Sequence, residues 1–94
     1  MAKPRPLGIV ACSAEGAALC YRTICAEGPA RLGPYAHPEI SIHSHSLADY
    51  TDCLYRGDWR GVADLMLVSA EKLAKTGAAF LNCPDNTIHE AFPL

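Results

Sequence analysis

The sequence lacks the positive charge that a large class of binding proteins needs. Its 94 residues contain no run of lysine and arginine, and the formal net charge is −2. Proteins that bind nucleic acid or an anionic membrane normally present a positive patch to it. We therefore expect neither nucleic acid nor a charged membrane surface as a partner.

Long hydrophobic runs are missing as well. The apolar stretch near the N-terminus is interrupted by Ser13, Glu15 and Gly16, so it is too short for the apolar region of a signal peptide. A membrane-spanning helix needs ~18 or more consecutive apolar residues, and no segment contains them. The sequence therefore predicts a soluble, cytoplasmic protein with no membrane partner.

Paired cysteine motifs are also absent. The five cysteines stand at positions 12, 20, 25, 53 and 83, which is an odd number with no CxxC spacing. No short-spaced group of cysteine and histidine resembles a structural zinc site. His43 and His45 are expected to point to opposite sides of their strand, and so not to bind one metal ion together. We expect reduced thiols and no metal site.

What is present is an alternation of short apolar runs with helical patterns. A chain of this length suggests one small domain. The apolar runs predict strands near 6–12, 38–43 and 78–83, of which the first and third are expected to be buried.

Helices are expected between and after these strands. The first should begin at Ser13, bury Ala17, Ala18, Tyr21, Ile24 and Cys25 on one face, and end at Gly28-Pro29. The second is expected from Leu47 to Gly57, with Tyr50 as a packing residue and with Leu47, Tyr50, Thr51 and Leu54 at helical spacing. The third is expected over roughly 58–76, with one face formed by Val62, Leu65, Met66, Ser69, Ala70 and Leu73, and the last from Asp85 onward.

The order of elements is typical of an α/β fold. Strands that alternate with helices form parallel sheets, with the helices covering the sheet faces. We expect a three-stranded parallel sheet of order 2-1-3, as in half of a flavodoxin-like domain, with 1–94 forming a single lobe. Such a narrow sheet and a last helix that has barely begun suggest part of a larger protein, with apolar surface exposed on this part.

Three polar segments follow the predicted strands and lead into helices, namely 12–15, 43–46 and 83–87. In an open parallel sheet, ligands bind beyond the carboxyl ends of the strands. Helix N-termini meeting there would suit a carboxylate or a phosphate. The alternative is purely structural: Ser13, Ser46 and Asp85 or Asn86 act only as helix caps, and Cys12 and Cys83 are packed, inert thiols.

Three stretches together resemble the aspartate/glutamate racemase superfamily, nearest to the N-terminal half of its amino-acid racemases. They are "LGIVACSAEGAALCYRTI", "SIHSHSLADYTDCLYRGDW" with its Arg-Gly-acid-Trp turn, and "KTGAAFLNCPDNTIH". The last is similar to the family's Cys-Asn-Thr-x-His signature. The resemblance extends from Leu7 to about Phe92.

This resemblance implies a cofactor-free racemase in which two flavodoxin-like lobes face each other across a cleft. Each lobe offers one acid/base group just before an Asn-Thr pair, and the two groups exchange a proton at the substrate's α-carbon. It also implies that Ser13, Asn86 and Thr87 bind the α-carboxylate of an acidic amino acid. Ser44 also follows a predicted strand, so we expect it to gather with these three residues and to bind substrate with them.

The turn at 83–87 departs from the family pattern. The family's catalytic cysteine directly precedes Asn-Thr, whereas here Asp85 stands in that place and Cys83 lies two residues earlier. We take Asp85 as the first candidate for the acid/base group and Cys83 as the second. The isolated chain is expected to be inactive and to need a second lobe or another copy of itself.

Two other functions remain open from the sequence. A site with one altered base could favour decarboxylation, as in a related lyase. The domain could also bind a small carboxylate without any catalysis, since a fold alone does not separate these functions.

Overall fold

The computed structural model describes residues 4–84. Within this range the elements are β1 (Leu7–Ala11), α1 (Ala14–Leu32), β2 (Ile40–Ser44), α2 (Leu47–Tyr55), α3 (Trp59–Lys75) and β3 (Phe80–Asn82). The three strands form one parallel sheet in the order β2-β1-β3. The predicted α/β class and strand order are therefore confirmed, whereas the helix predicted from Asp85 onward lies outside the described residues.

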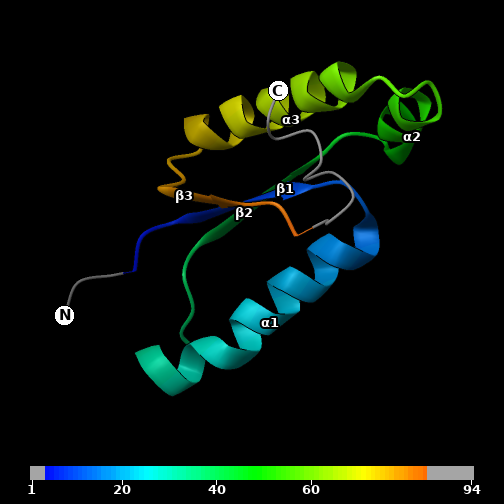
Figure 1. Ribbon diagram of the computed structural model, residues 1–94. Helices are drawn as coiled ribbons and strands as arrows, with labels where there is room; N and C mark the ends of the chain where they lie inside the picture. The colour runs from blue at the N-terminus through cyan, green and yellow to red at the C-terminus, as the bar shows by residue number, and fades with distance from the viewer. Residues whose placement is uncertain (1–3, 85–94) are drawn as a thin grey trace.

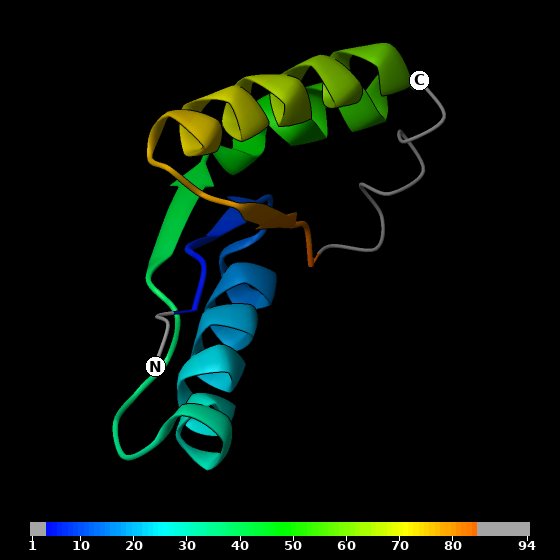
Figure 2. The same ribbon diagram turned by 90° about the vertical axis from the view of Figure 1, so that its left-hand side faces the viewer.

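The sheet separates two helical layers (Figure 1). Helix α1 lies on one face, while α3 lies on the other with α2 beside it, and the view turned by 90° shows the same arrangement (Figure 2). The central strand β1 is therefore covered on both sides, which explains its unbroken apolar sequence LGIVA. No helix in the described part of the chain is both long and apolar enough to cross a membrane.

Side chains of β1 alternate between the two layers. Ile9 and Ala11 pack with Ala17 of α1, whereas Cys12 packs with residues of α2 and α3. Gly8 faces the α3 side, where an added Cβ would lie 3.2 Å from the Cβ atoms of both Leu73 and Ala78. Glycine is needed here because a Cβ atom is fixed to the backbone, so neither neighbour can move away from an added side chain.

The predicted end of α1 at Gly28-Pro29 is wrong. The helix continues to Leu32, and Gly33 ends it with φ 105° and a 3.0 Å bond from its N–H to the Pro29 carbonyl oxygen. Gly28 instead makes room for the returning chain, since an added Cβ would lie 2.5 Å from the Ala36 carbonyl oxygen. A glycine required for close packing was taken for a terminator.

The buried face of α1 is also narrower than predicted. Only Ala17 of this 19-residue helix is fully buried, with Cys20 and Ile24 packed beside it. Tyr21, expected on the buried face, is 41% exposed. The cause is the path of the helix, which diverges from the sheet toward its C-terminal end (Figures 1 and 2).

Helices α2 and α3 hold the larger part of the core. The buried stripe of α3 is Val62, Met66, Ser69 and Leu73, in agreement with the predicted face. Helix α2 buries Tyr50 and Cys53, and of these only Tyr50 was expected on its apolar face.

Strand β3 contradicts the prediction of a third buried strand. It is three residues long, and Phe80 and Leu81 are 56% and 47% exposed. Its position explains the exposure, because β3 lies at the sheet edge and, within residues 4–84, pairs only with β1. Phe80 and Leu81 are therefore exposed apolar side chains at this edge.

Candidate functional site

The predicted site residues that the structure describes lie at the end of the sheet formed by the carboxyl ends of its strands. Ala11, the last residue of β1, pairs with Ser44, the last residue of β2, so Ser13 and Ser44 both stand at the carboxyl ends of adjacent strands. Cys83 directly follows β3 on the other side of β1. Asp85, Asn86 and Thr87 lie outside the described residues.

Both serine hydroxyls make local hydrogen bonds. Ser13 Oγ accepts the backbone N–H of Gly16 at 3.2 Å and so caps α1, as the structural alternative predicted. Its hydroxyl proton is not used in that bond and remains able to donate to an acceptor. Ser44 is exposed, and its hydroxyl donates to the carbonyl oxygen of His45 at 2.9 Å.

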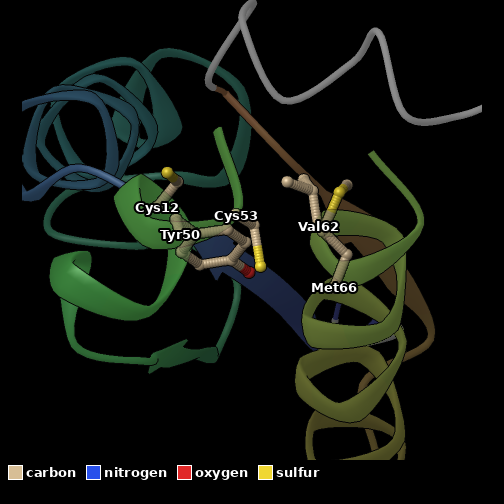
Figure 3. Packing of buried hydrophobic residues seen from close by; sticks show 5 residues of the cluster. All are labelled: Cys12, Tyr50, Cys53, Val62 and Met66. Carbon is tan, nitrogen blue, oxygen red and sulfur yellow. The ribbon is translucent and has the colours of Figure 1, made fainter. Parts of the chain in front are cut away.

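A compact group of buried side chains lies next to these strand ends. We call Cys12, Tyr50, Cys53, Val62 and Met66 the strand-end cluster. Figure 3 shows Cys12 at the end of the strand, Tyr50 and Cys53 on α2, and Val62 and Met66 reaching in from α3. Cys83 is half-buried and packs against this cluster.

Tyr50 is the central polar residue of the strand-end cluster. Its side chain has no exposed surface, and its hydroxyl makes no hydrogen bond among the described residues. Burial raises the pKa of Tyr50 to about 12; the nearby Ser69 hydroxyl opposes this effect, and the thiols of Cys12 and Cys83 add to it. Although Ser69 lies near enough to influence Tyr50, the two hydroxyls are not in hydrogen-bonding geometry, and Ser69 is engaged elsewhere.

Ser69 is hydrogen-bonded to His43. The two histidines also lie differently from the sequence prediction. Ser69 Oγ lies 2.6 Å from His43 Nδ1, and His45 Nε2 donates to the Leu65 carbonyl oxygen at 2.8 Å. The two imidazole rings are 4.8 Å apart, so they share one side of the chain rather than pointing to opposite sides. The physical reason is that residues two apart on a strand lie on the same face.

The histidines therefore connect the β2 segment to α3. Burial lowers the pKa of His43, and the charges of Lys72 and His45 lower it further, so its neutral form is favoured. Among residues 4–84, no group of three or more histidine, cysteine, aspartate or glutamate side chains is arranged to hold a metal ion.

The Arg-Gly-acid-Trp turn has a structural role in this molecule. Gly57 adopts a positive φ of 66°, and Asp58 Oδ1 accepts the Gly61 N–H at 2.8 Å to cap α3. The Arg56–Asp58 ion pair is long, at 3.8 Å, and largely exposed, so it contributes little to stability. This part of the sequence is explained by the connection between α2 and α3.

Sequence reasoning missed the two polar residues beneath the strand ends. Tyr50 was interpreted as a packing residue, which accounts for its ring but not for its unpartnered hydroxyl. Ser69 was placed on the apolar face of α3 without a partner. A hydroxyl on an otherwise apolar helical stripe is the signal that could have pointed to the His43 bond.

Comparison of the chain with known protein families and with curated proteins finds no match to either. The case for a function therefore rests on the residues of this chain and on their placement at the strand ends.

Proposed function

We propose that the protein catalyses racemase-type proton transfer at the α-carbon of aspartate or glutamate without a cofactor, with this chain forming one lobe of the site. The observation that supports this most directly is the convergence of Ser13, Ser44 and Cys83 at the carboxyl ends of a parallel sheet of order β2-β1-β3. That edge is where open α/β sheets bind small ligands. The sequence resemblance to amino-acid racemases supplies the reaction.

In this proposal the serines bind the substrate's α-carboxylate together with Asn86 and Thr87. Ser13 is ready to donate, because its bond to Gly16 uses an oxygen lone pair and leaves its proton available. Ser44 must turn its hydroxyl away from the His45 carbonyl, an exchange favoured by the charge of the ligand. Neutralising the carboxylate stabilises the carbanion-like transition state.

Asp85 is proposed to remove the α-proton from one face of the substrate. A second acid must return a proton to the opposite face, and it would come from a second lobe or from another copy of the chain. Cys83 is the second candidate for the base, but it packs against the strand-end cluster. Pro84 stands between Cys83 and Asp85 in the sequence and restricts the backbone directly before Asp85.

A pair of substitutions tests this assignment in the full-length protein. Asp85→Asn keeps the size and much of the capping ability of the side chain but removes its proton-transfer chemistry. We expect this variant to lose exchange of the α-proton of aspartate or glutamate with deuterated solvent, measured by NMR. Cys83→Ala should largely retain exchange and serves as the matched control.

Other results would reassign the site. Loss of exchange in Cys83→Ala alone would make the thiol the base. Release of carbon dioxide in place of exchange would indicate a lyase. Saturable binding of aspartate by calorimetry with neither reaction would identify a carboxylate-binding domain.

A further inference from the structure

Two histidines at the end of β2 bind α3 one helical turn apart. His43 Nδ1 lies 2.6 Å from Ser69 Oγ, and His45 Nε2 lies 2.8 Å from the Leu65 carbonyl oxygen. Two residues along a strand span about 7 Å and four residues along a helix span about 6 Å, so the two spacings match. The histidines therefore fix this strand end to α3 at two points.

The bond from His45 occupies the Leu65 carbonyl. A carbonyl oxygen can only accept, so His45 Nε2 carries the proton in this bond. Within α3 the same oxygen accepts the backbone N–H of Ser69. Because a carbonyl oxygen has two lone pairs, these two bonds use it fully. A helical serine can return its hydroxyl proton to this carbonyl, but here the position is already taken.

The hydroxyl proton of Ser69 consequently determines the form of His43. Ser69 is completely buried, so this proton needs an acceptor inside the protein. Among residues 4–84 the Ser69 hydroxyl makes one hydrogen bond, which is the contact with His43 Nδ1. Every group is satisfied when Ser69 donates and His43 is neutral, with its own proton on Nε2.

We propose that protonation of His43 releases the carboxyl end of β2 from α3. A second proton on the ring makes Nδ1 a donor, so that Nδ1 and the Ser69 hydroxyl both direct a proton into the same 2.6 Å contact. Ser69 must then turn its proton away, while the Leu65 carbonyl is held by His45. An unsatisfied buried donor replaces the hydrogen bond, so the strand end and the helix separate more readily.

The groups around His43 act in the same direction. The His45 ring lies 4.8 Å away, and burial, followed by the charges of Lys72 and His45, lowers the pKa of His43. Beyond His45 stands Tyr50 of α2, with its ring 5.8 Å away and its hydroxyl outside hydrogen-bonding geometry with Ser69. The strands β1 and β3 have the sequences LGIVA and FLN, which contain no ionisable side chain.

Release of this strand end has a consequence for the proposed function. Ser44 stands between the two histidines, so its hydroxyl loses its fixed position when the end of β2 leaves α3. In the function proposed above Ser44 binds the substrate's α-carboxylate, and His43 is then a positioning residue that acts through Ser44. The affinity for aspartate would fall in acid. This consequence rests on the proposed function, whereas the release itself does not.

NMR of the histidine ring nitrogens tests the hydrogen-bond assignment, because it reports both the tautomer and the titration midpoint. We expect neutral His43 to carry its proton on Nε2 and to titrate below the ordinary value of 6.5. Ser69→Ala removes the donor to Nδ1 and should raise this midpoint. A proton on Nδ1 of neutral His43, or a midpoint that Ser69→Ala leaves unchanged or lowers, would overturn the proposal.

Amide hydrogen exchange of residues 40–46, over a pH series from about 7 to about 5, tests the release. We expect protection, relative to the unfolded chain, to fall below pH 6.5 by up to about tenfold per pH unit. His43→Gln cannot gain a proton, so its protection should depend little on pH. His37→Gln is the matched control, since His37 is exposed and this variant should follow the unmodified protein.

Two results of the exchange experiment would also overturn the proposal. One is protection of residues 40–46 that does not change with pH in the unmodified protein, and the other is the full pH dependence retained in His43→Gln. Neither measurement requires substrate or turnover, so failure of this proposal is distinct from failure of the proposed racemase activity.

Discussion

At the scale of single residues, Tyr50 makes the stability of the protein depend on pH at alkaline values. In the folded protein burial raises its pKa from the ordinary 10.0 to about 12. The unfolded chain therefore loses this proton first as pH rises. The stability that the neutral hydroxyl supports is complete below pH 10 and is lost as pH rises through about 12.

Substitution of Tyr50 should reveal this dependence. We expect the free energy of unfolding to fall less between pH 10 and about 12 in Tyr50→Phe than in the unmodified protein. Denaturant unfolding followed by circular dichroism measures the difference. Tyr35→Phe is the control, since Tyr35 is 96% exposed and should follow the unmodified protein. Equal slopes in all three proteins would contradict the assignment.

Residue-scale features were the hardest to obtain from the sequence. The Ser13 cap could be predicted, because it depends on neighbours three residues away. The His43–Ser69 bond joins residues 26 apart in the chain, and the unpartnered Tyr50 hydroxyl is the result of packing from several elements. No local pattern encodes such contacts.

At the scale of elements, the two helices on one side of the sheet begin differently. Asp58 caps α3 by accepting the Gly61 N–H at 2.8 Å, whereas Ser46 at the start of α2 makes no side-chain cap bond. The two positions allow a comparison between a cap bond that is formed, at Asp58, and one that the sequence also predicts but that is not formed, at Ser46.

We expect Asp58→Ala to lower the free energy of unfolding by about 1 kcal/mol, because it leaves a helix N–H without its acceptor. Asp58→Asn should retain most of the stability, since the amide oxygen can still accept. Ser46→Ala should change stability much less. Thermal and urea unfolding measure all three variants. Unchanged stability in Asp58→Ala would show that the Asp58 bond is not formed in solution, and an equal loss in Ser46→Ala would show that Ser46 caps α2 as well.

Element types were predictable, but their ends and burial were less so. The apolar stripe of α3 repeats over enough turns to identify its buried face. Gly28 and Pro29 look like a helix end locally, yet the close approach of Ala36 and the better terminus at Gly33 determine the outcome. The apolar sequence of β3 predicted burial, whereas burial depends on its place in the sheet.

At the scale of the whole molecule, the alternating order of elements was sufficient to predict the architecture. Parallel strands need helical crossovers, and this requirement leaves few arrangements for three strands. The edge at which the strand ends meet follows from the same topology, so the positions of Ser13 and Ser44 could be predicted. What these residues bind depends on chemistry beyond the sheet, which a strand order does not specify.

The divergence of α1 from the sheet has a consequence for how the molecule opens. Helix α1 is anchored through Ala17, with Cys20 and Ile24 beside it, and Pro29 cannot donate a backbone hydrogen bond within its last turns. Local unfolding of the half beyond Ile24 exposes little apolar surface, so amide hydrogens there should exchange with deuterium roughly tenfold or more faster than those in the buried stripe of α3. Hydrogen-exchange mass spectrometry tests this, and uniform protection along α1 would argue against it. The end of α1 that stays protected begins at Ser13, so the protein can fray at one end of this helix while the strand ends stay in place.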